Sequence, residues 1–228
     1  MQVANGGLLL ALTQYLQFVL GYSPTKAGLA FIPMMVASIV FNGLGAGFGS
    51  KVGNRTLAVT GMLVSTVGLG LLASLSADSG FGMLSVALVI LGAGAGLAQP
   101  AAIAALMGAV PQEQAGVGSA LNDTIQQAGA ALGIAVLGSI LSSTFTSSMP
   151  DSIPAAARHS ISDALALVAS SGDTELLGTA REAFTTAMSA SFIAGGVGIL
   201  AGAIVALFVM RNNKTAPVDV LDEAALAE

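Results

Sequence analysis

The sequence of 228 residues contains no cysteine and a single histidine, His159. Without cysteine the chain cannot form disulfides, thiolate nucleophiles, Cys-type zinc sites or iron–sulfur clusters. His159 stands in a polar segment with no second metal-ligating residue type at a recognised spacing, so we expect a loop histidine. The sequence therefore predicts no metal and no cofactor.

Charged residues are also scarce. They make up 8% of the chain against 54% hydrophobic residues, whereas ordinary soluble domains are roughly a quarter charged. A net charge of −5 without a basic patch argues against a nucleic-acid partner. The first apolar run has no basic segment before it and no small-residue cleavage pattern after it, so we do not expect a cleaved signal peptide. The composition predicts an integral membrane protein with the lipid bilayer as its partner.

The apolar residues are gathered in six runs long enough to cross a bilayer, which predicts an all-α bundle of six transmembrane helices. We expect these spans at 3–21, 27–49, 56–76, 81–108, 115–144 and 186–210. Pro100 interrupts the fourth run, so we expect a tilt or a kink there. Residues 145–185 form a hydrophilic loop with two weakly amphipathic pieces, near 155–170 and 175–185, and 211–228 form a polar tail.

Basic residues in the short connections indicate the orientation. Four lie on the side of the two termini: Lys51, Arg55, Arg211 and Lys214. Three lie on the opposite side: Lys26, Arg158 and Arg181. Because cytoplasmic loops carry the excess of Lys and Arg, we expect both termini in the cytoplasm and the 145–185 loop outside.

A polar stripe crosses the fifth run. At 3.6 residues per turn, one face of the helix contains Ser119, Asn122, Gln126, Gly129 and Gly133. Asp123 and Gln127 lie on the adjacent row. The opposing face is apolar and contains Leu121, Ile125, Ala128, Leu132 and Val136. Amide side chains are costly in hydrocarbon, so they should face an aqueous cavity and line a transport path. Alternatively, the small residues and amides hold neighbouring helices together. The residues alone leave both interpretations open.

Other polar residues within the runs raise the same choice between a substrate pathway and inter-bundle packing. These candidates are Gln14, Gln17, Asn42 and Gln99, alongside Asn122 and Gln126. Gln99 precedes Pro100, whose ring frees a backbone carbonyl, so a hinge is as plausible there as a binding site. Asp123 is the acidic residue placed inside a span and is the candidate proton carrier or gating residue, although an acid near a helix N-terminus is also favoured by the helix dipole.

Pairs of glycines four residues apart recur along the runs. Such pairs let helices pack tightly, but in a glycine-rich chain some arise by chance, so no single pair proves a contact. The pairs are Gly43/Gly47, Gly45/Gly49, Gly92/Gly96, Gly129/Gly133 and Gly198/Gly202. The GAGAG at 92–96 has no preceding strand and no following lysine, so we do not expect it to bind a phosphate. No nucleophile, base and orienting group can be assembled from the embedded residues, so we do not expect an enzyme.

Several extended segments resemble the C-terminal part of the fourteen-span drug:proton antiporter branch of the major facilitator superfamily. They are QYLQFVLGYSPTKAGLAFIP at 14–33, GAGAGLAQP at 92–100, VPQEQAGVGSALNDTIQQAGAALGIAVLGSIL at 110–141 and AREAFTTAMSAS at 180–191. The loop with Lys51, Gly53 and Arg55 resembles a degenerate copy of the cytoplasmic signature of that superfamily, with Ser50 where an Asp often stands. Gln126 stands where relatives usually have an Arg.

The resemblance implies a multi-pass transporter of the cell membrane that exports amphipathic compounds in exchange for protons. In that architecture the substrate binds between two six-helix bundles, and this chain corresponds only to the second. It would therefore need the missing N-terminal bundle, or a homodimer partner, to complete a pathway. The alternative is a truncated or stand-alone membrane module without transport activity, or one half of a split transporter.

Overall fold

The computed structural model describes residues 2–77, 79–108 and 110–210, apart from the side chains of Val3, Asn5, Ser50, Lys51 and Gln112. The predicted tail 211–228, with Arg211 and Lys214, lies outside the described residues. Within those residues every regular element is a helix, which confirms the predicted all-α class. The elements are α1 (Gln2–Gln14), a π turn (Tyr15–Val19), α2 (Pro24–Leu29), α3 (Ile32–Val52), α4 (Asn54–Ala73), α5 (Phe81–Met107), a 3₁₀ turn (Gln112–Gln114), α6 (Ala115–Ser148), a 3₁₀ turn (Ala155–Arg158), α7 (Ile161–Ser171) and α8 (Thr174–Val209).

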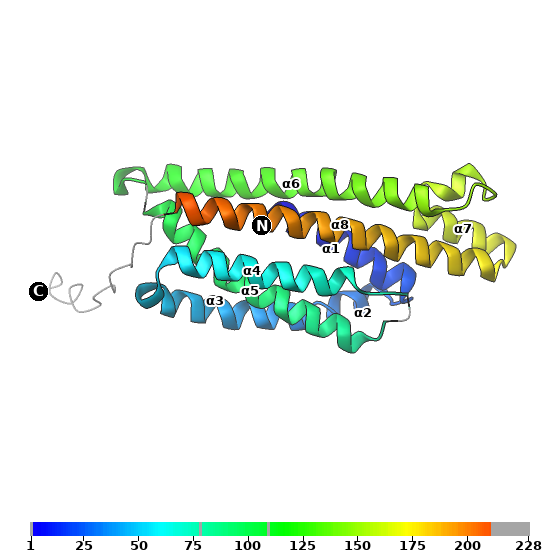
Figure 1. Cartoon of the computed structure of the whole chain (residues 1–228), viewed down its shortest axis with the longest axis horizontal. Coiled ribbons are helices and arrows are strands. Elements are labelled where there is room, and N and C mark those ends of the chain that lie inside the picture. The colour runs from blue at the N-terminus through cyan, green and yellow to red at the C-terminus, as the bar shows by residue number, and fades with distance from the viewer. Residues whose placement is uncertain (1, 78, 109, 211–228) are drawn as a thin grey trace, which may run out of the picture.

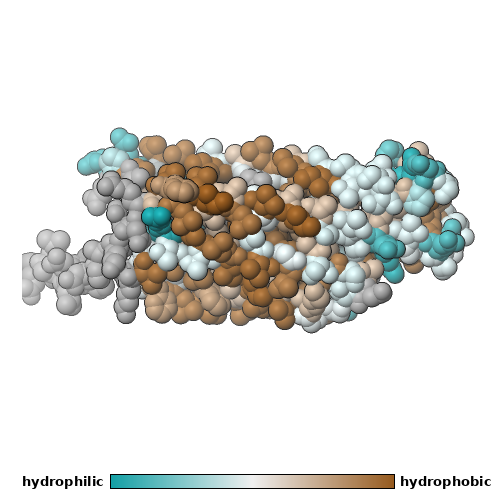
Figure 2. Space-filling model, viewed as in Figure 1, coloured by the Kyte–Doolittle hydropathy of each residue, from teal (hydrophilic) through white to brown (hydrophobic). Residues whose placement is uncertain are grey.

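The long helices run side by side along one axis (Figure 1). In this view α6 and α3 lie at opposite edges, with α1 and α8 between them. Apolar side chains cover the middle of the visible face, and hydrophilic ones gather at the end that holds α7 (Figure 2). Large apolar side chains are exposed on these helices, for example Ile39 (73%) of α3 and Phe208 (86%) of α8. A wide apolar belt between two polar ends is the surface expected of a protein embedded in a bilayer.

Five helical stretches of the described chain are long and apolar enough to cross a membrane. They are Pro24–Gly49, Asn54–Ala73, Phe81–Met107, Ala115–Ser148 and Thr174–Val209. The first predicted span, 3–21, is instead a shorter apolar helix, α1 with its π turn, which begins partway along the bundle (Figure 1). The predicted six spans thus become five of membrane length and one shorter helix.

The predicted loop at 145–185 is shorter than its composition suggests. α6 continues to Ser148, and the amphipathic piece near 175–185 is the start of α8, not a separate surface helix. Asp173 explains this beginning, because its Oδ1 accepts hydrogen bonds from Glu175 N and Leu176 N, both at 3.0 Å. At about 1.5 Å per residue, the 34 residues of α6 and the 36 of α8 are longer than the hydrocarbon core of about 30 Å.

Two other boundaries differ from the sequence expectation. The span predicted at 27–49 is divided into α2 and α3 at Ala30 and Phe31. The loop predicted at 50–55 is reduced to Gly53, whose φ of +92° suits glycine and joins α3 directly to α4. Pro100 lies inside α5, which continues to Met107.

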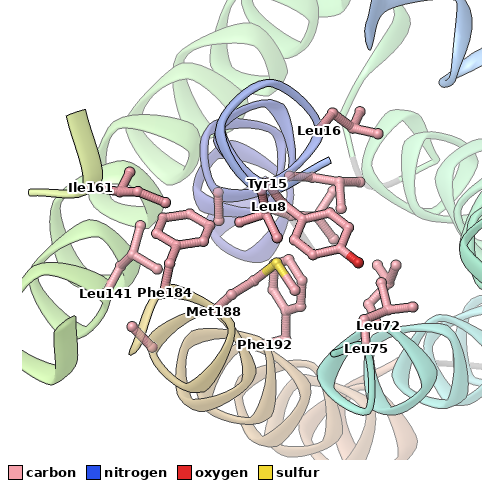
Figure 3. Packing of buried hydrophobic residues seen from close by; sticks show 14 of the residues in the cluster. Leu8, Tyr15, Leu16, Leu72, Leu75, Leu141, Ile161, Phe184, Met188 and Phe192 are labelled. Atoms are coloured by element: carbon pink, nitrogen blue, oxygen red, sulfur yellow. The ribbon is translucent and has the colours of Figure 1, made fainter. Parts of the chain in front are cut away.

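The main hydrophobic core forms where the π turn after α1 meets α4 and α8. Tyr15 lies fully buried there beside Met188 and Phe192 of α8 and Leu72 of α4 (Figure 3). Its hydroxyl donates a hydrogen bond of 2.8 Å to the carbonyl oxygen of Ser76. This bond ties the end of α1 to the connection that follows α4, and it satisfies a polar group that would be costly to bury alone.

Glycines allow α5 to pack closely against two neighbours. A Cβ added at Gly92 would lie 2.3 Å from the carbonyl oxygen of Met34 in α3, and one at Gly94 would lie 2.5 Å from the backbone nitrogen of Ser65 in α4. Real Cβ atoms do not approach backbone this closely, so these contacts require glycine. The Gly43/Gly47 and Gly198/Gly202 pairs have open space around them, so they make no close helix contact among the described residues.

This contrast yields a stability prediction. Gly92→Ala should lower the free energy of unfolding by about 1–3 kcal/mol, because α3 and α5 must separate to admit the methyl group. Gly43→Ala, the control on the open side of α3, should change it by less than about 0.5 kcal/mol. Denaturation of both purified variants in mixed micelles measures the difference. Equal stabilities would show that the α3–α5 contact is not as close as described.

Candidate functional site

A cavity of about 760 Å³ lies among α1, α3, α4, α5, α6 and α8. It exists because α5 packs on α3 and α4, whereas α6 packs mainly on α1 and α8. The space between these two groups of helices is left unfilled. Three lining residues, Met35, Ile39 and Ile125, are more than half exposed, so the cavity opens at the surface between α3 and α6.

The cavity wall is apolar with scattered uncharged polar groups. Its polar side chains are Gln2, Ser38, Ser65, Gln99, Asn122 and Gln126, and its most polarisable ones are Met34, Met35 and Met62. Among the described lining residues there is no Asp, Glu, Lys, Arg or His. A wall of this kind can bind an amphipathic molecule through apolar contact and neutral hydrogen bonds, but it offers no ion pair.

The polar stripe of α6 faces this cavity over part of its length. Asn122, Gln126 and Gly129 line it, and Gln2 Nε2 donates a hydrogen bond of 2.6 Å to Gln126 Oε1. Gln126 therefore holds α1 against α6 and lines the cavity as well. Ile125, which the sequence placed on the apolar face, also lines the cavity, whereas Leu132 of that face does not line it and is 60% exposed.

The structure brings together three of the six predicted pathway residues, Gln99, Asn122 and Gln126. The other three do not line the cavity. Gln14 and Gln17 lie half-buried at the end of α1 and in the π turn, and Asn42 is exposed on α3. The assignment of all six to a pathway or to inter-bundle packing stays a prediction.

Asp123 is exposed on α6 and does not line the cavity. Its nearest recorded partner is Asn122, whose Nδ2 donates to Asp123 Oδ1 at 3.4 Å. The carboxylate thus lies beside the cavity wall, and its predicted role in proton transfer or gating stays a prediction.

The residues of the predicted cytoplasmic signature surround the junction of α3 and α4. Gly53 makes the turn, and Arg55 lies half-buried in the first turn of α4. Lys51 belongs to the last turn of α3, but its side chain lies outside the described residues. The signature role of these three residues stays a prediction.

Sequence reasoning missed several residues of the wall, above all Ser65 and the methionines. Ser65 is 1% exposed and shares one face of α4 with Gly61 and Gly68, four residues before it and three after. That small-residue face marks the contact with α5 and could have been found. Nothing in the sequence distinguishes Met34 and Met62 from methionines that face lipid.

The sequence of this chain was compared with protein families and with known proteins. The family model described as Major Facilitator Superfamily matches residues 1–224. "Multidrug efflux pump LfrA" of Mycolicibacterium smegmatis is 29% identical over 217 residues, which are 90% of this chain and 43% of that protein. "Methyl viologen resistance protein SmvA" of Salmonella typhimurium is 32% identical over 199 residues, 83% of this chain and 40% of that protein. The "Tetracenomycin C resistance and export protein" of Streptomyces glaucescens is 34% identical over 146 residues, 64% of this chain and 27% of that protein.

The cavity predicts a pattern of water accessibility that single cysteines can test, since the chain contains none of its own. Cysteines replacing Gln99 or Asn122 should react quickly with a water-soluble methanethiosulfonate, because thiolate forms in water. Cysteines replacing Ile193 or Ile204, which are exposed on α8 outside the cavity lining, should react at least about tenfold more slowly in lipid. Equal rates in proteoliposomes at both pairs of positions would contradict a hydrated cavity.

Proposed function

Since the chain belongs to the Major Facilitator Superfamily, a family of membrane transporters rather than enzymes, we propose that it forms the C-terminal half of a proton-coupled multidrug exporter of the fourteen-span branch. The observation that carries this proposal is the large, uncharged cavity that opens at the surface between α3 and α6. The curated relatives supply the context, because this chain spans 43% of one and 40% of another. An N-terminal bundle set against the open side would close the cavity and complete a pathway.

The proposed substrates are amphipathic compounds. The names of three relatives refer to multidrug efflux, to methyl viologen resistance and to tetracenomycin C export. The wall of this chain suits such molecules because methionine and leucine side chains supply adaptable apolar contact, while Gln99 and Asn122 supply hydrogen bonds.

Proton coupling requires a titratable side chain on or near the pathway. The described cavity wall contains no titratable side chain, so a carrier on this half must act from beside the wall. Asp123 is the candidate, since it neighbours Asn122 on α6. A proton-carrying residue in the N-terminal half would serve equally well. In either case, proton-coupled export would be driven by a proton gradient across the membrane.

The open side of the cavity also favours a second candidate, in which this chain alone is a membrane module without transport. A bundle that supplies only one wall cannot alternate access by itself. A homodimer or a separately encoded N-terminal half would then provide the missing wall.

We further propose that the protein lies in the cell membrane, with both termini in the cytoplasm and α7 outside. His159→Cys and Glu113→Cys report on the two ends, because both residues are exposed and α6 separates them. In intact cells a membrane-impermeant maleimide should label the cysteine at 159, whereas the cysteine at 113 should need permeabilised cells. The reverse pattern would invert the proposed topology.

Transport is tested by joining this chain to the N-terminal half of a relative. Cells lacking their own exporters should accumulate less methyl viologen when they produce the chimera, and a protonophore should abolish the difference. The chain produced alone should not lower accumulation, because it supplies one wall. Efflux by the chain alone would contradict the half-transporter proposal, and efflux that resists the protonophore would contradict proton coupling.

Substitutions in the same chimera test whether the polar stripe lines the path. Asn122→Ala and Gln126→Ala should each lower the initial efflux rate severalfold, because both side chains line the cavity. Gln127→Ala is the matched control, since this amide neighbours Gln126 but is exposed and does not line the cavity. Unchanged rates in the first two variants would leave the stripe with a packing role only.

A further inference from the structure

Gln99 lies in the middle of the face that α5 turns toward the cavity. Ala95, Gln99, Ala102 and Leu106 all line the cavity, and their spacing of three or four residues places them on one face of the helix. Of the α5 residues in the lining, only Gln99 is polar, and it is exposed. The alanine methyl groups one turn away on either side are too short to cover its amide, so the amide stands free of the wall.

The packing of its two neighbours in the chain fixes the direction of Gln99. Ala98 is fully buried against α4, where a Cβ added at Gly61 would lie 2.6 Å from the backbone nitrogen of Ala98. Pro100 packs on α3, where a Cβ added at Gly45 would lie 3.3 Å from Pro100 Cγ. Two sides of α5 are thus occupied by helices at this level, and the Gln99 side chain extends from the remaining side into the cavity.

The Gln99 amide has no hydrogen-bond partner among the described residues. The amides on the α6 wall do have partners: Gln126 Oε1 accepts a hydrogen bond from Gln2, and Asn122 Nδ2 donates one to Asp123. An amide at membrane depth is costly unless a partner satisfies it. Gln99 therefore keeps its whole hydrogen-bonding capacity for a molecule inside the cavity.

The chemistry of an amide indicates the group that fits it. A side-chain amide carries a carbonyl acceptor and an N–H donor next to each other. A lactam offers the complementary pair, an N–H beside a carbonyl group, and it can form two parallel hydrogen bonds with the amide. Ala95 and Ala102 leave a shallow apolar surface beside the amide, which suits a flat ring. The described wall contains no charged side chain that would select an ionic group instead.

We infer that Gln99 is a specificity-determining residue, whose amide forms two parallel hydrogen bonds with the lactam group of a planar ring compound in the cavity. The inference rests on the proposed function, because it assumes that the cavity receives transported compounds. It deepens that function by naming the ligand group that this half recognises and the residue that recognises it.

Two ring compounds of the same skeleton test the inference. Phenanthridinone carries a lactam N–H beside its carbonyl group, and N-methylphenanthridinone carries a methyl group in place of that hydrogen. The purified chain is placed in lipid nanodiscs, and the binding of each compound is measured by equilibrium dialysis, with empty nanodiscs subtracted to remove partitioning into lipid. The native chain should bind phenanthridinone more tightly than its N-methyl derivative, by about fivefold for one neutral hydrogen bond.

Gln99→Met should abolish this preference, because methionine has a similar length but no amide. Gln127→Met is the matched control, since Gln127 is exposed on α6 and does not line the cavity. It should keep the preference. The thermal unfolding midpoint of ligand-free Gln99→Met should not fall, because the substitution deletes an amide without a partner among the described residues, so lost binding would not reflect unfolding.

Three results would overturn the inference: no phenanthridinone preference in the native chain, a preference that survives Gln99→Met, or an equal loss in Gln127→Met. The second result would mean that the added methyl group is disfavoured by its size alone and that water satisfies the Gln99 amide. These outcomes are separate from those of the proposed function, since methyl viologen has neither a carbonyl group nor an N–H and its efflux by the chimera does not depend on these bonds. A chimera that fails to export would overturn the proposed function and leave the Gln99 result standing.

Discussion

The structure depends on the close contact of α5 with α3 on one side and α4 on the other. Gly92 and Gly96 admit the backbone of α3, and Gly94 admits that of α4. In a bilayer the hydrophobic effect does not drive helices together, so close van der Waals contact between small residues has to do so. Once both sides of α5 are occupied in this way, α6 is held by α1 and α8, and the cavity is the space that remains.

Polar bonds between helices complete this arrangement at a few points. Tyr15 bonds to the carbonyl oxygen of Ser76, Gln2 to Gln126, and Ser191 Oγ donates to the carbonyl oxygen of Leu137 at 3.1 Å. Each bond joins residues that are at least 54 positions apart in the chain. In a medium without water these contacts fix the positions of helices that apolar packing alone would leave free to slide.

The fold class and much of the helix pattern were predictable, because a bilayer forces every spanning segment to be a long apolar helix. The cost of amides in lipid made a cavity-facing position one of two interpretations for Asn122 and Gln126, and both residues line the cavity. Tertiary neighbours were not predictable from local patterns. Gly92/Gly96 and Gly43/Gly47 have the same spacing, yet the first pair packs against backbone and the second faces open space. Ser65 was missed for the same reason, since its burial depends on the contact between α4 and α5.

The stripe on α6 combines helix contacts with a position on the cavity wall. Gln126 is bonded to Gln2, which fixes α1 against α6 at the cavity wall. Asn122, about one turn away, bonds only to the adjacent Asp123 among the described residues, at a long 3.4 Å. One amide therefore positions the helix, and its neighbour keeps most of its hydrogen-bonding capacity for whatever enters the cavity. Because this wall is uncharged, it can discriminate between ligands only by shape and by neutral hydrogen bonds, so any ion pair with a charged ligand has to come from outside the wall.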